Sequence, residues 1–382
     1  MPGIAVSRQE LIRPSRALSA LRQPFVGAVR IAIITTAVAW LPPLLLSALG
    51  GAASVRGFLL DYAAQSRLLI VIGILIITEP GIVNRLDLIA QTFVDDKLIR
   101  EEDRPKFESV LGKFRRLGNS LLGQAILLGI ACLTTAFLVL QIEPDTFLPW
   151  CYGNGGVQNL SPAGSWYVLV SIPITFYLFL RWIGRQVLWT WFLFVVSRMN
   201  LQTIPAHPDR VAGLGFLETC HRKYIPFSFA MGTVVAGGVA NRVLHGHRPL
   251  TYYRFHPLFV IAVVVAICAG PLCALFGTLL DAKRRGIFEY GALAMSVGRQ
   301  FEQKWLAASR EQQAALQVQD FSATIDLYSV VANVHQMDLF PLKASHLTRL
   351  AVCSLLPFIP VALASLPFEV VMKALIKLLI GG

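Results

Sequence analysis

Long apolar runs separated by short polar segments make up most of this chain, and this alternation is typical of a protein that crosses a membrane several times. A helix needs about 20 residues to cross the hydrocarbon core of a bilayer. Six runs come close to or exceed that length, at about residues 26–49, 68–83, 120–141, 166–198, 224–243 and 257–280. The pattern therefore predicts an all-α fold, a polytopic membrane helical bundle with six or seven transmembrane helices, and a transmembrane domain over 26–280.

Two apolar stretches leave alternatives open. The fourth, 166–198, has 33 residues, which is too many for one perpendicular span. We expect it either to tilt and project beyond the bilayer or to break near Arg181. The ending, 350–382, contains Pro357 and Pro360 before an amphipathic segment, and it predicts a seventh span or a re-entrant hairpin with an amphipathic C-terminal helix.

Two polar segments, 84–118 and 281–349, each carry eight basic and seven acidic residues. Apolar residues recur in them at the spacing of amphipathic helices: Phe107, Val110, Leu111 and Phe114 in the first, and Ile287, Tyr290, Ala294, Val297, Phe301, Trp305, Phe321, Ile325, Tyr328 and Val331 in the second. We expect both segments to be cytosolic helices, with the faces of the second packed on each other. If Phe301 and Trp305 were exposed instead, they would suit a cytosolic protein partner.

Composition strengthens the membrane interpretation. Only 15% of the residues are charged and 55% are apolar, whereas soluble domains carry about 25% charged residues. The lipid bilayer is therefore the first partner that we expect. The net charge is +12, but the basic residues form no tracts and do not alternate with aromatic residues, so we expect no nucleic acid partner.

The distribution of basic residues predicts the orientation. A cytosolic N-terminus places about 24 Lys and Arg in cytosolic segments and about five outside, which follows the positive-inside rule. Residues 1–25, with four arginines, are then a cytosolic or interfacial N-terminal segment.

Motifs of known chemistry are missing from the sequence. Most of the six cysteines lie inside apolar runs, and no Cys/His spacing of a metal site occurs. No phosphate-binding glycine loop, GxSxG or HExxH motif occurs either. We therefore expect no metal and no cofactor, and no catalytic residue can be named. Gly232, Ala236 and Gly237 in the fifth span permit close helix packing, and they permit a homo-oligomer without requiring one.

Charged side chains are few in the apolar runs, and three of them, Glu79, Arg181 and Arg185, lie away from the ends of the long runs or next to a proline, where ionisable groups are costly and usually functional. Glu79 is the only carboxylate in a predicted span, and Arg181 and Arg185 lie one helical turn apart on the fourth run. We predict an ion pair across helices between Glu79 and one of these arginines. The alternative is that Glu79 lies at the cytosolic interface, at a depth that Trp182 and Trp189 would also mark.

The polar segment 201–223 lies between two long apolar runs and gathers titratable side chains, prolines and glycines. Its candidate site residues are His207, Asp209, Arg210, Gly213, Gly215 and Glu218. Asp209 could cap a short helix that begins at Arg210, and the glycines would interrupt that helix or let another backbone approach. Arg210 could bind a phosphate or carboxylate, with Asp209 and His207 orienting it or relaying a proton. Alternatively, Asp209 and Arg210 only tie the loop to the helix ends.

Three stretches carry a resemblance: HPDRVAGLGFLE at 207–218, IDLYSVVANVHQMDLFPLK at 325–343 and SLLPFIPVALASLPFEVVMKALIKLL at 354–379. Together they resemble an uncharacterised family of bacterial multi-pass inner-membrane proteins with no assigned function. The likeness covers roughly the second half of the chain, and the family pattern has a glycine where this chain has Ala212. The resemblance implies location in the bacterial inner (cytoplasmic) membrane, and it implies no substrate and no catalytic residue.

Three functions compete at this point. The leading hypothesis is a channel or carrier for a small solute or ion, because transport paths use intramembrane charges and irregular backbone. The second is a membrane scaffold or signalling protein that docks a cytosolic partner through its helical segments. The third, which we favour less, is an enzyme that modifies lipid headgroups, and it requires His207, Asp209 and Arg210 to converge on a lipid-accessible cleft.

Overall fold

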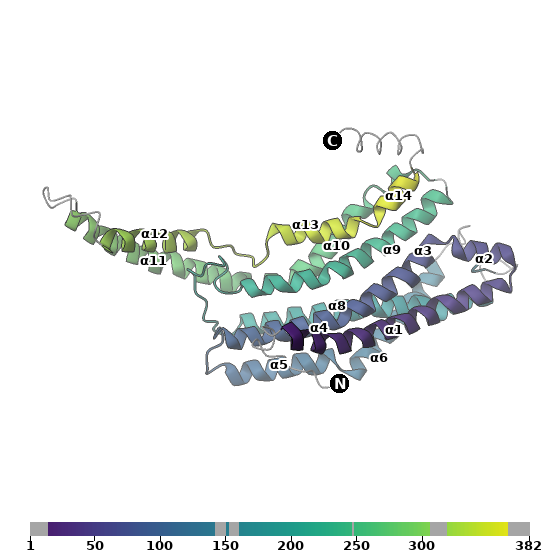
Figure 1. Ribbon diagram of the computed structural model, residues 1–382, viewed down its shortest axis with the longest axis horizontal. Helices are drawn as coiled ribbons and strands as arrows, with labels where there is room; N and C mark the ends of the chain where they lie inside the picture. The colour runs from purple at the N-terminus through teal and green to yellow at the C-terminus, as the bar shows by residue number, and fades with distance from the viewer. Residues whose placement is uncertain (1–13, 142–149, 153–159, 247, 306–318, 366–382) are drawn as a thin grey trace.

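The computed structural model describes residues 14–141, 150–152, 160–246, 248–305 and 319–365. Within these ranges the chain is helical and contains no β-strand, so the predicted all-α fold is confirmed. Figure 1 shows a long bundle of helices with a helical hairpin projecting from one end.

The elements follow one another along the bundle with short connections. The first are α1 (Pro14–Ala48), α2 (Ala52–Leu59), α3 (Tyr62–Gln65), the π-helical turn η1 (Ser66–Val71), α4 (Ile72–Asp95), α5 (Arg104–Gly118) and α6 (Leu121–Gln141). Next come α7 (Pro162–Trp166), the π-helical turn η2 (Tyr167–Ser171), α8 (Ile172–Ser197), the 3₁₀ helix η3 (Gly215–Tyr224) and α9 (Ile225–Leu244). The last are the 3₁₀ helix η4 (Leu250–Tyr253), α10 (His256–Ala269), the 3₁₀ helix η5 (Gly270–Leu275), α11 (Phe276–Trp305), α12 (Gln319–His335), α13 (Ala344–Leu355) and α14 (Phe358–Ser365).

Within the described ranges, six helical runs are long and apolar enough to cross a membrane: Phe25–Ala48, Tyr62–Asp95, Leu121–Leu140, Pro162–Ser197, Gly215–Leu244 and Leu250–Gln303. The pair α13 and α14, bent by 47°, makes a seventh if it is one span. Large apolar side chains on the outer helices are exposed, as lipid contact requires, for example Ile33, Leu133 and Phe259. Length and composition thus indicate a multi-pass membrane bundle with six or seven spans.

The fourth run does not break near Arg181, so that alternative is wrong. Here α8 continues from Ile172 to Ser197, and the only departure from α-helical geometry in the run is the π-helical turn η2 before it. At the N-terminus, α1 begins at Pro14 and continues into the first span. The rest of the expected interfacial segment, residues 1–13, and the expected C-terminal helix, in 366–382, lie outside the described residues.

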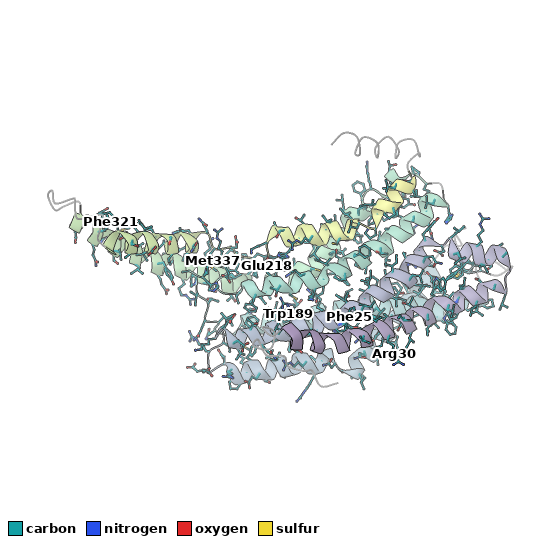
Figure 2. All side chains as sticks on the ribbon, viewed as in Figure 1. Phe25, Arg30, Trp189, Glu218, Phe321 and Met337 are labelled. Atoms are coloured by element: carbon teal, nitrogen blue, oxygen red, sulfur yellow. The ribbon has the colours of Figure 1, made fainter. Side chains whose placement is uncertain are left out.

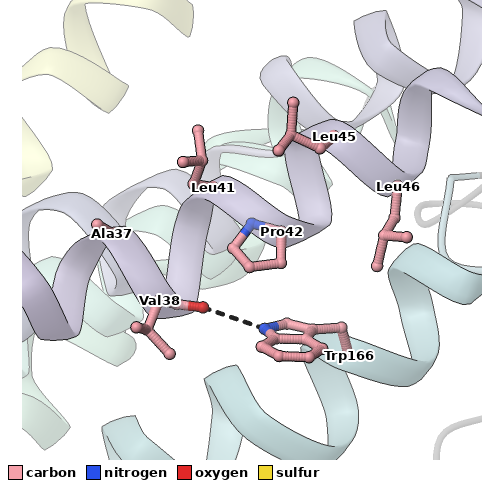
Figure 3. Close-up of a pocket in the computed structure, with 7 residues that line it drawn as sticks. All are labelled: Ala37, Val38, Leu41, Pro42, Leu45, Leu46 and Trp166. Carbon is pink, nitrogen blue, oxygen red and sulfur yellow. Dashed lines mark hydrogen bonds between the residues drawn. The ribbon is translucent and has the colours of Figure 1, made fainter.

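A proline near the C-terminal end of α1 is compensated by another helix. Pro42 lacks the N–H that would bond the carbonyl of Val38, and Trp166 Nε1 on α7 donates to that carbonyl at 3.1 Å (Figure 3). Trp166 also lines a groove of about 550 Å³ together with apolar side chains of α1. Since an unpaired carbonyl is costly in lipid, this bond helps to fix α7 against α1.

The next proline is compensated in the same way, and this pairing can be tested. Pro43 leaves the Ala39 carbonyl free, and the buried Ser171 hydroxyl donates to it at 2.6 Å. We expect Ser171→Ala to reduce the free energy of unfolding by about 1–3 kcal/mol, because it leaves a buried carbonyl without a donor. Adding Pro43→Ala should restore an N–H in α1 and recover most of that loss. The measurement is unfolding of the purified protein in mixed micelles; Ser296→Ala, at an exposed hydroxyl that bonds within its own helix, is the control.

In the sixth span, a side chain of another helix again donates to a carbonyl that a proline leaves free. Pro271 leaves the Ile267 carbonyl without its α-helical donor, and Gln186 Nε2 on α8 donates to that oxygen at 3.0 Å. His221 Nε2 on η3 lies 3.0 Å from the Cys268 carbonyl beside it. Side chains of two neighbouring elements therefore complete the backbone where the helix tightens into η5.

Helix α9 lies between two layers of the bundle and uses a glycine on each side. A Cβ on Gly232 would collide with the backbone carbonyl of Ser354 on α13, and a Cβ on Gly237 would collide with Ser66 Oγ and approach the Tyr62 carbonyl. Both neighbours are therefore in backbone contact with α9, as the small residues of this span predicted.

Helices α11 and α12 form the projecting hairpin. They pack along each other, and Phe301 meets Phe321 edge to face with ring centroids 4.8 Å apart. Figure 2 shows Phe321 near the tip and Met337 at the base. Phe301 is thus partly buried by its own hairpin, and the side chain of Trp305 lies outside the described residues.

Candidate functional site

Glu79, Arg181 and Arg185 form one largely buried group. Arg181 Nε and Arg185 Nη2 on α8 each lie 2.6 Å from Glu79 Oε1 on α4. Glu79 is 8% exposed, and the side chains of Arg181 and Arg185 are 29% and 14% exposed. The structure therefore places both arginines, not one, against the carboxylate, and the three charges sum to one positive charge.

This group lies within the apolar thickness of the bundle. Gly184, between the two arginines in sequence, packs against Leu127, whose Cδ1 is 3.6 Å from the position of a Cβ on Gly184. Leu127 is well inside α6, which has the length of one span. Trp182 and Trp189 are fully buried in the protein rather than turned towards a lipid interface. These positions favour the intramembrane ion pair over the interfacial alternative.

The pairing of α4 with α8 is fixed at the same level. Pro80, directly after Glu79, removes one backbone N–H from the interior of α4. Trp182 Nε1 on α8 donates to the Leu75 carbonyl of α4 at 3.2 Å. The arginines on α8 are therefore held beside Glu79 by a second contact between the two helices.

More cationic groups lie nearby than carboxylates. Lys223 Nζ, which precedes α9, is 3.8 Å from the position of a Cβ on Gly81, two residues after Glu79. Arg85 follows on the same helix, and its Nε is buried. Gly81 and Arg85 face away from Glu79 on the helix, so Lys223 and Arg85 flank this stretch of α4 without joining the ionic group. With two arginines and one carboxylate, that group is suited to negative charge.

The loop before α9 is organised by one carboxylate. Asp209 Oδ1 accepts hydrogen bonds from the N–H groups of Val211 at 2.9 Å and Gly213 at 3.1 Å, and Oδ2 accepts one from Gly215 N–H at 2.9 Å. His207 Nδ1 lies 2.8 Å from Oδ1. The carboxylate is thus engaged by the loop itself.

No helix begins at Arg210, so the predicted cap at that position is wrong. Arg210, Ala212 and Gly213 have φ angles of 60°, 56° and 92°, in the left-handed region that a right-handed helix excludes. The first helical residue is Gly215, and Asp209 bonds its N–H instead. A Cβ on Gly215 would lie 3.0 Å from Asp209, so a larger residue would push the Asp209 side chain aside and glycine favours this close approach.

The same loop joins the bundle to the hairpin. Gln202 N–H donates to the Leu98 carbonyl at 2.8 Å, which ties the loop to the segment after α4, and Asp338 N–H donates to the Arg210 carbonyl at 2.7 Å, which ties it to the segment after α12. These bonds favour the alternative in which Asp209 and Arg210 hold the loop to neighbouring elements. They give no support to a headgroup-modifying site at His207, Asp209 and Arg210.

The pKa of Asp209 gives this loop a pH dependence. Burial alone would raise the pKa of its carboxyl, but the N–H groups of Val211, Gly215 and Gly213, together with His207, outweigh burial and hold that pKa below its ordinary value. A lowered pKa in the folded state contributes stability above the unfolded value of about 3.9, and this contribution is lost as pH falls through the folded pKa.

We therefore expect Asp209→Asn to lower the free energy of unfolding by about 1–3 kcal/mol at pH 7, because the amide group turns a donor towards an N–H. The difference from wild type should shrink as pH falls below about 4 and the wild-type carboxyl becomes protonated. Unfolding of the two proteins in mixed micelles at a series of pH values measures this, with the exposed Asp281→Asn as control. A difference that stays constant down to pH 3 would contradict the role given to this carboxylate.

Glu218 belongs to a different cluster from Asp209. Its carboxylate contacts His346 Nε2 and lies 3.4 Å from Lys343 Nζ, and Figure 2 shows it between the hairpin and the bundle. The side chain thus ties η3 to the start of α13. The six loop residues proposed from the sequence therefore do not form one site.

Two buried polar residues escaped the sequence reasoning. Asp61 accepts hydrogen bonds from Ala64 N–H, Asn241 Nδ2 and Trp150 Nε1 at 2.8–3.1 Å, and its position before an apolar run was a helix-start signal. Tyr224, 1% exposed, packs its ring edge to face on Trp182 of α8. Nothing in its local sequence distinguishes it, because this partner belongs to another helix.

Among the residues that the structure describes, no three His, Cys, Asp or Glu side chains gather closely enough to hold a metal ion.

Comparison of the chain with protein families, with curated proteins and with solved structures gives no match. The resemblance to bacterial inner-membrane proteins stays an expectation from three sequence stretches.

Proposed function

We propose that this protein is a channel or carrier for a small solute or ion, and that Glu79, Arg181 and Arg185 form the charged closure of its path. The observation that carries the proposal is the placement of both arginines at 2.6 Å from one buried carboxylate, between α4 and α8. Charged groups at this depth are costly, and they commonly line the paths of ions and polar solutes.

The irregular backbone around this group supports the same proposal. Pro80 lies beside the carboxylate in α4, and Pro271 interrupts the sixth span where Gln186 of α8 binds the freed carbonyl. Transporters use interrupted helices of this kind at the level of the solute. A carbonyl held by a side chain of another helix can be released when the helices move apart, so these contacts provide hinges beside the closure.

The test is flux of anionic, cationic and uncharged solutes across liposomes that contain the purified protein. We expect flux in the wild type and at least about a tenfold fall in Glu79→Gln and Arg185→Gln, because each neutralises one of the charged groups that bind and release the solute along the path. Asp87→Asn, on α4 but in a partly exposed pair with Arg115, is the matched control. No flux of any solute in the wild type, or equal flux in all four proteins, would contradict the proposal.

One observation favours a second candidate, a scaffold that docks another protein. The projecting hairpin exposes Phe288 and Met295 of α11, at 78% and 60%, and Ile325 of α12, at 66%, although the sequence pattern predicted that Ile325 packs inside the hairpin. A photoreactive residue in place of Phe288 should then join one discrete second protein in native membranes. The same residue at the exposed Lys113 of α5 should not; equal labelling from both positions would count against this candidate.

A further inference from the structure

We infer that the charged group between α4 and α8 is a binding site for a phosphate-type oxyanion. When the site is closed, the Glu79 carboxylate pairs with the two arginines in place of this oxyanion. This inference rests on the proposed transport function and names its solute class. It depends on charge, on unused donors and on the position of Tyr224.

The group carries more positive than negative charge. Arg181 and Arg185 meet a single carboxylate at one of its oxygens, Glu79 Oε1. A bundle that needed only structural neutrality here would require one cation for Glu79. The excess of positive charge in an apolar setting is large enough to hold a second anion.

Two buried donors of this region are unused among the described residues. Within the described part of the chain, Arg185 Nη1 and the Tyr224 hydroxyl are both buried and have no hydrogen-bond partner. Burying such groups unpaired costs about 1–3 kcal/mol each. Tyr224 is held next to these charges by Trp182, which packs edge to face on its ring with centroids 5.8 Å apart. An incoming oxyanion would give both groups an acceptor.

The donors of this group match the oxygens of a phosphate. A guanidinium presents its N–H groups as a planar fork that matches two oxygens of a phosphate or carboxylate. Two guanidinium groups and one hydroxyl supply more donors than the two oxygens of a carboxylate accept well, but they suit the oxygens of a phosphate. The shared chemistry is a phosphate group, carried either by a free solute or by a lipid headgroup.

The role of Glu79 follows from these steps. Its carboxylate occupies the donors of Arg181 and Arg185 that a phosphate would use, so the two anions compete. Removing the charge of Glu79 should therefore tighten phosphate binding, whereas removing a donor should weaken it. Substitutions at neighbouring residues that change phosphate affinity in opposite directions distinguish a ligand site from a merely structural cluster.

The experiment is titration calorimetry of the purified protein in uncharged detergent with inorganic phosphate, and separately with short-chain phosphatidic acid. We expect the wild type to bind phosphate, Glu79→Gln to bind it at least severalfold more tightly, and Arg185→Gln and Tyr224→Phe to bind it at least about tenfold more weakly, the ratio that one hydrogen bond to a charged group gives. The exposed Arg56→Gln on α2 should match the wild type. Tighter binding of phosphatidic acid than of phosphate identifies a lipid headgroup as the source, and equal binding identifies the free solute.

Tyr224→Phe is the variant whose effect on binding is not explained by misfolding. It keeps the ring and removes a hydroxyl without a partner among the described residues, so a purely structural role would leave stability unchanged or raise it and would not alter phosphate binding. The inference is overturned if neither phosphate probe binds, or if the four variants bind alike. Phosphate binding without flux of any solute would leave this site standing and remove the transport function; flux of another solute without phosphate binding would do the reverse.

Discussion

Glu79→Gln should lower the free energy of unfolding by about 3–5 kcal/mol, the usual cost of leaving a buried charge without its partner. The loss is large because two guanidinium groups, at 2.6 Å, lose the same carboxylate. Glutamine keeps the size of the side chain, so lost volume contributes little. Unfolding in mixed micelles with increasing sodium dodecyl sulfate, followed by tryptophan fluorescence, measures the change.

Two further variants separate charge from packing. Replacing Glu79, Arg181 and Arg185 together by leucine should recover most of the stability, because removing a whole buried ionic group is often neutral. Asp87→Asn breaks the 2.9 Å pair with Arg115, which is partly exposed, and should cost no more than about 1 kcal/mol. If Glu79→Gln were as mild as Asp87→Asn, the group would be solvated in the membrane protein and the closure would lose its physical basis.

Gly232→Ala should cost about 3 kcal/mol or more and is expected to reduce the yield of folded protein. The new methyl group would occupy the space of the Ser354 backbone carbonyl on α13, and a backbone cannot move aside as a flexible side chain can. Helix α13 would have to separate from α9. The measurement is again unfolding in mixed micelles, together with the monodisperse fraction after purification.

A neighbouring glycine gives a close control. Gly238 lies on the same helix, and no atom lies within 4 Å of the position of its Cβ among the described residues. Gly238→Ala should leave stability unchanged or raise it by up to about 1 kcal/mol through helix propensity. Equal losses from Gly232→Ala and Gly238→Ala would show that backbone freedom, rather than contact with α13, determines the effect.

The sequence predicted the all-α class and the six or seven long apolar helices, because apolar length is a local property. It also pointed to Glu79, Arg181 and Arg185, since charges inside apolar runs are few and have few partners to choose from. That both arginines share one oxygen depends on the rotation of α8 against α4, which single-sequence patterns do not determine. Tyr224 was missed for the same reason.

The conformation of the loop before α9 was not predicted from the sequence. Its residues suggested a helix start at Arg210, but left-handed backbone at Arg210 and Ala212 has no signal in residues that usually avoid it. What stabilises this conformation is the carboxylate of Asp209 and the bonds to Leu98 and Asp338. The last two partners are more than 100 residues away in sequence, so local pattern could not supply them.

The prolines of α1 have a consequence for how the chain is made. During synthesis, α1 emerges from the ribosome before Trp166 and Ser171 do. The side chains of these two residues donate hydrogen bonds to the Val38 and Ala39 carbonyls of α1. When α1 first enters the bilayer, those two carbonyls must be hydrated or otherwise bonded. Assembly of the amino-terminal span should therefore finish only after the fourth span has been synthesised, and chains truncated before Ser171 should retain a first helix that is open to water and to proteolysis.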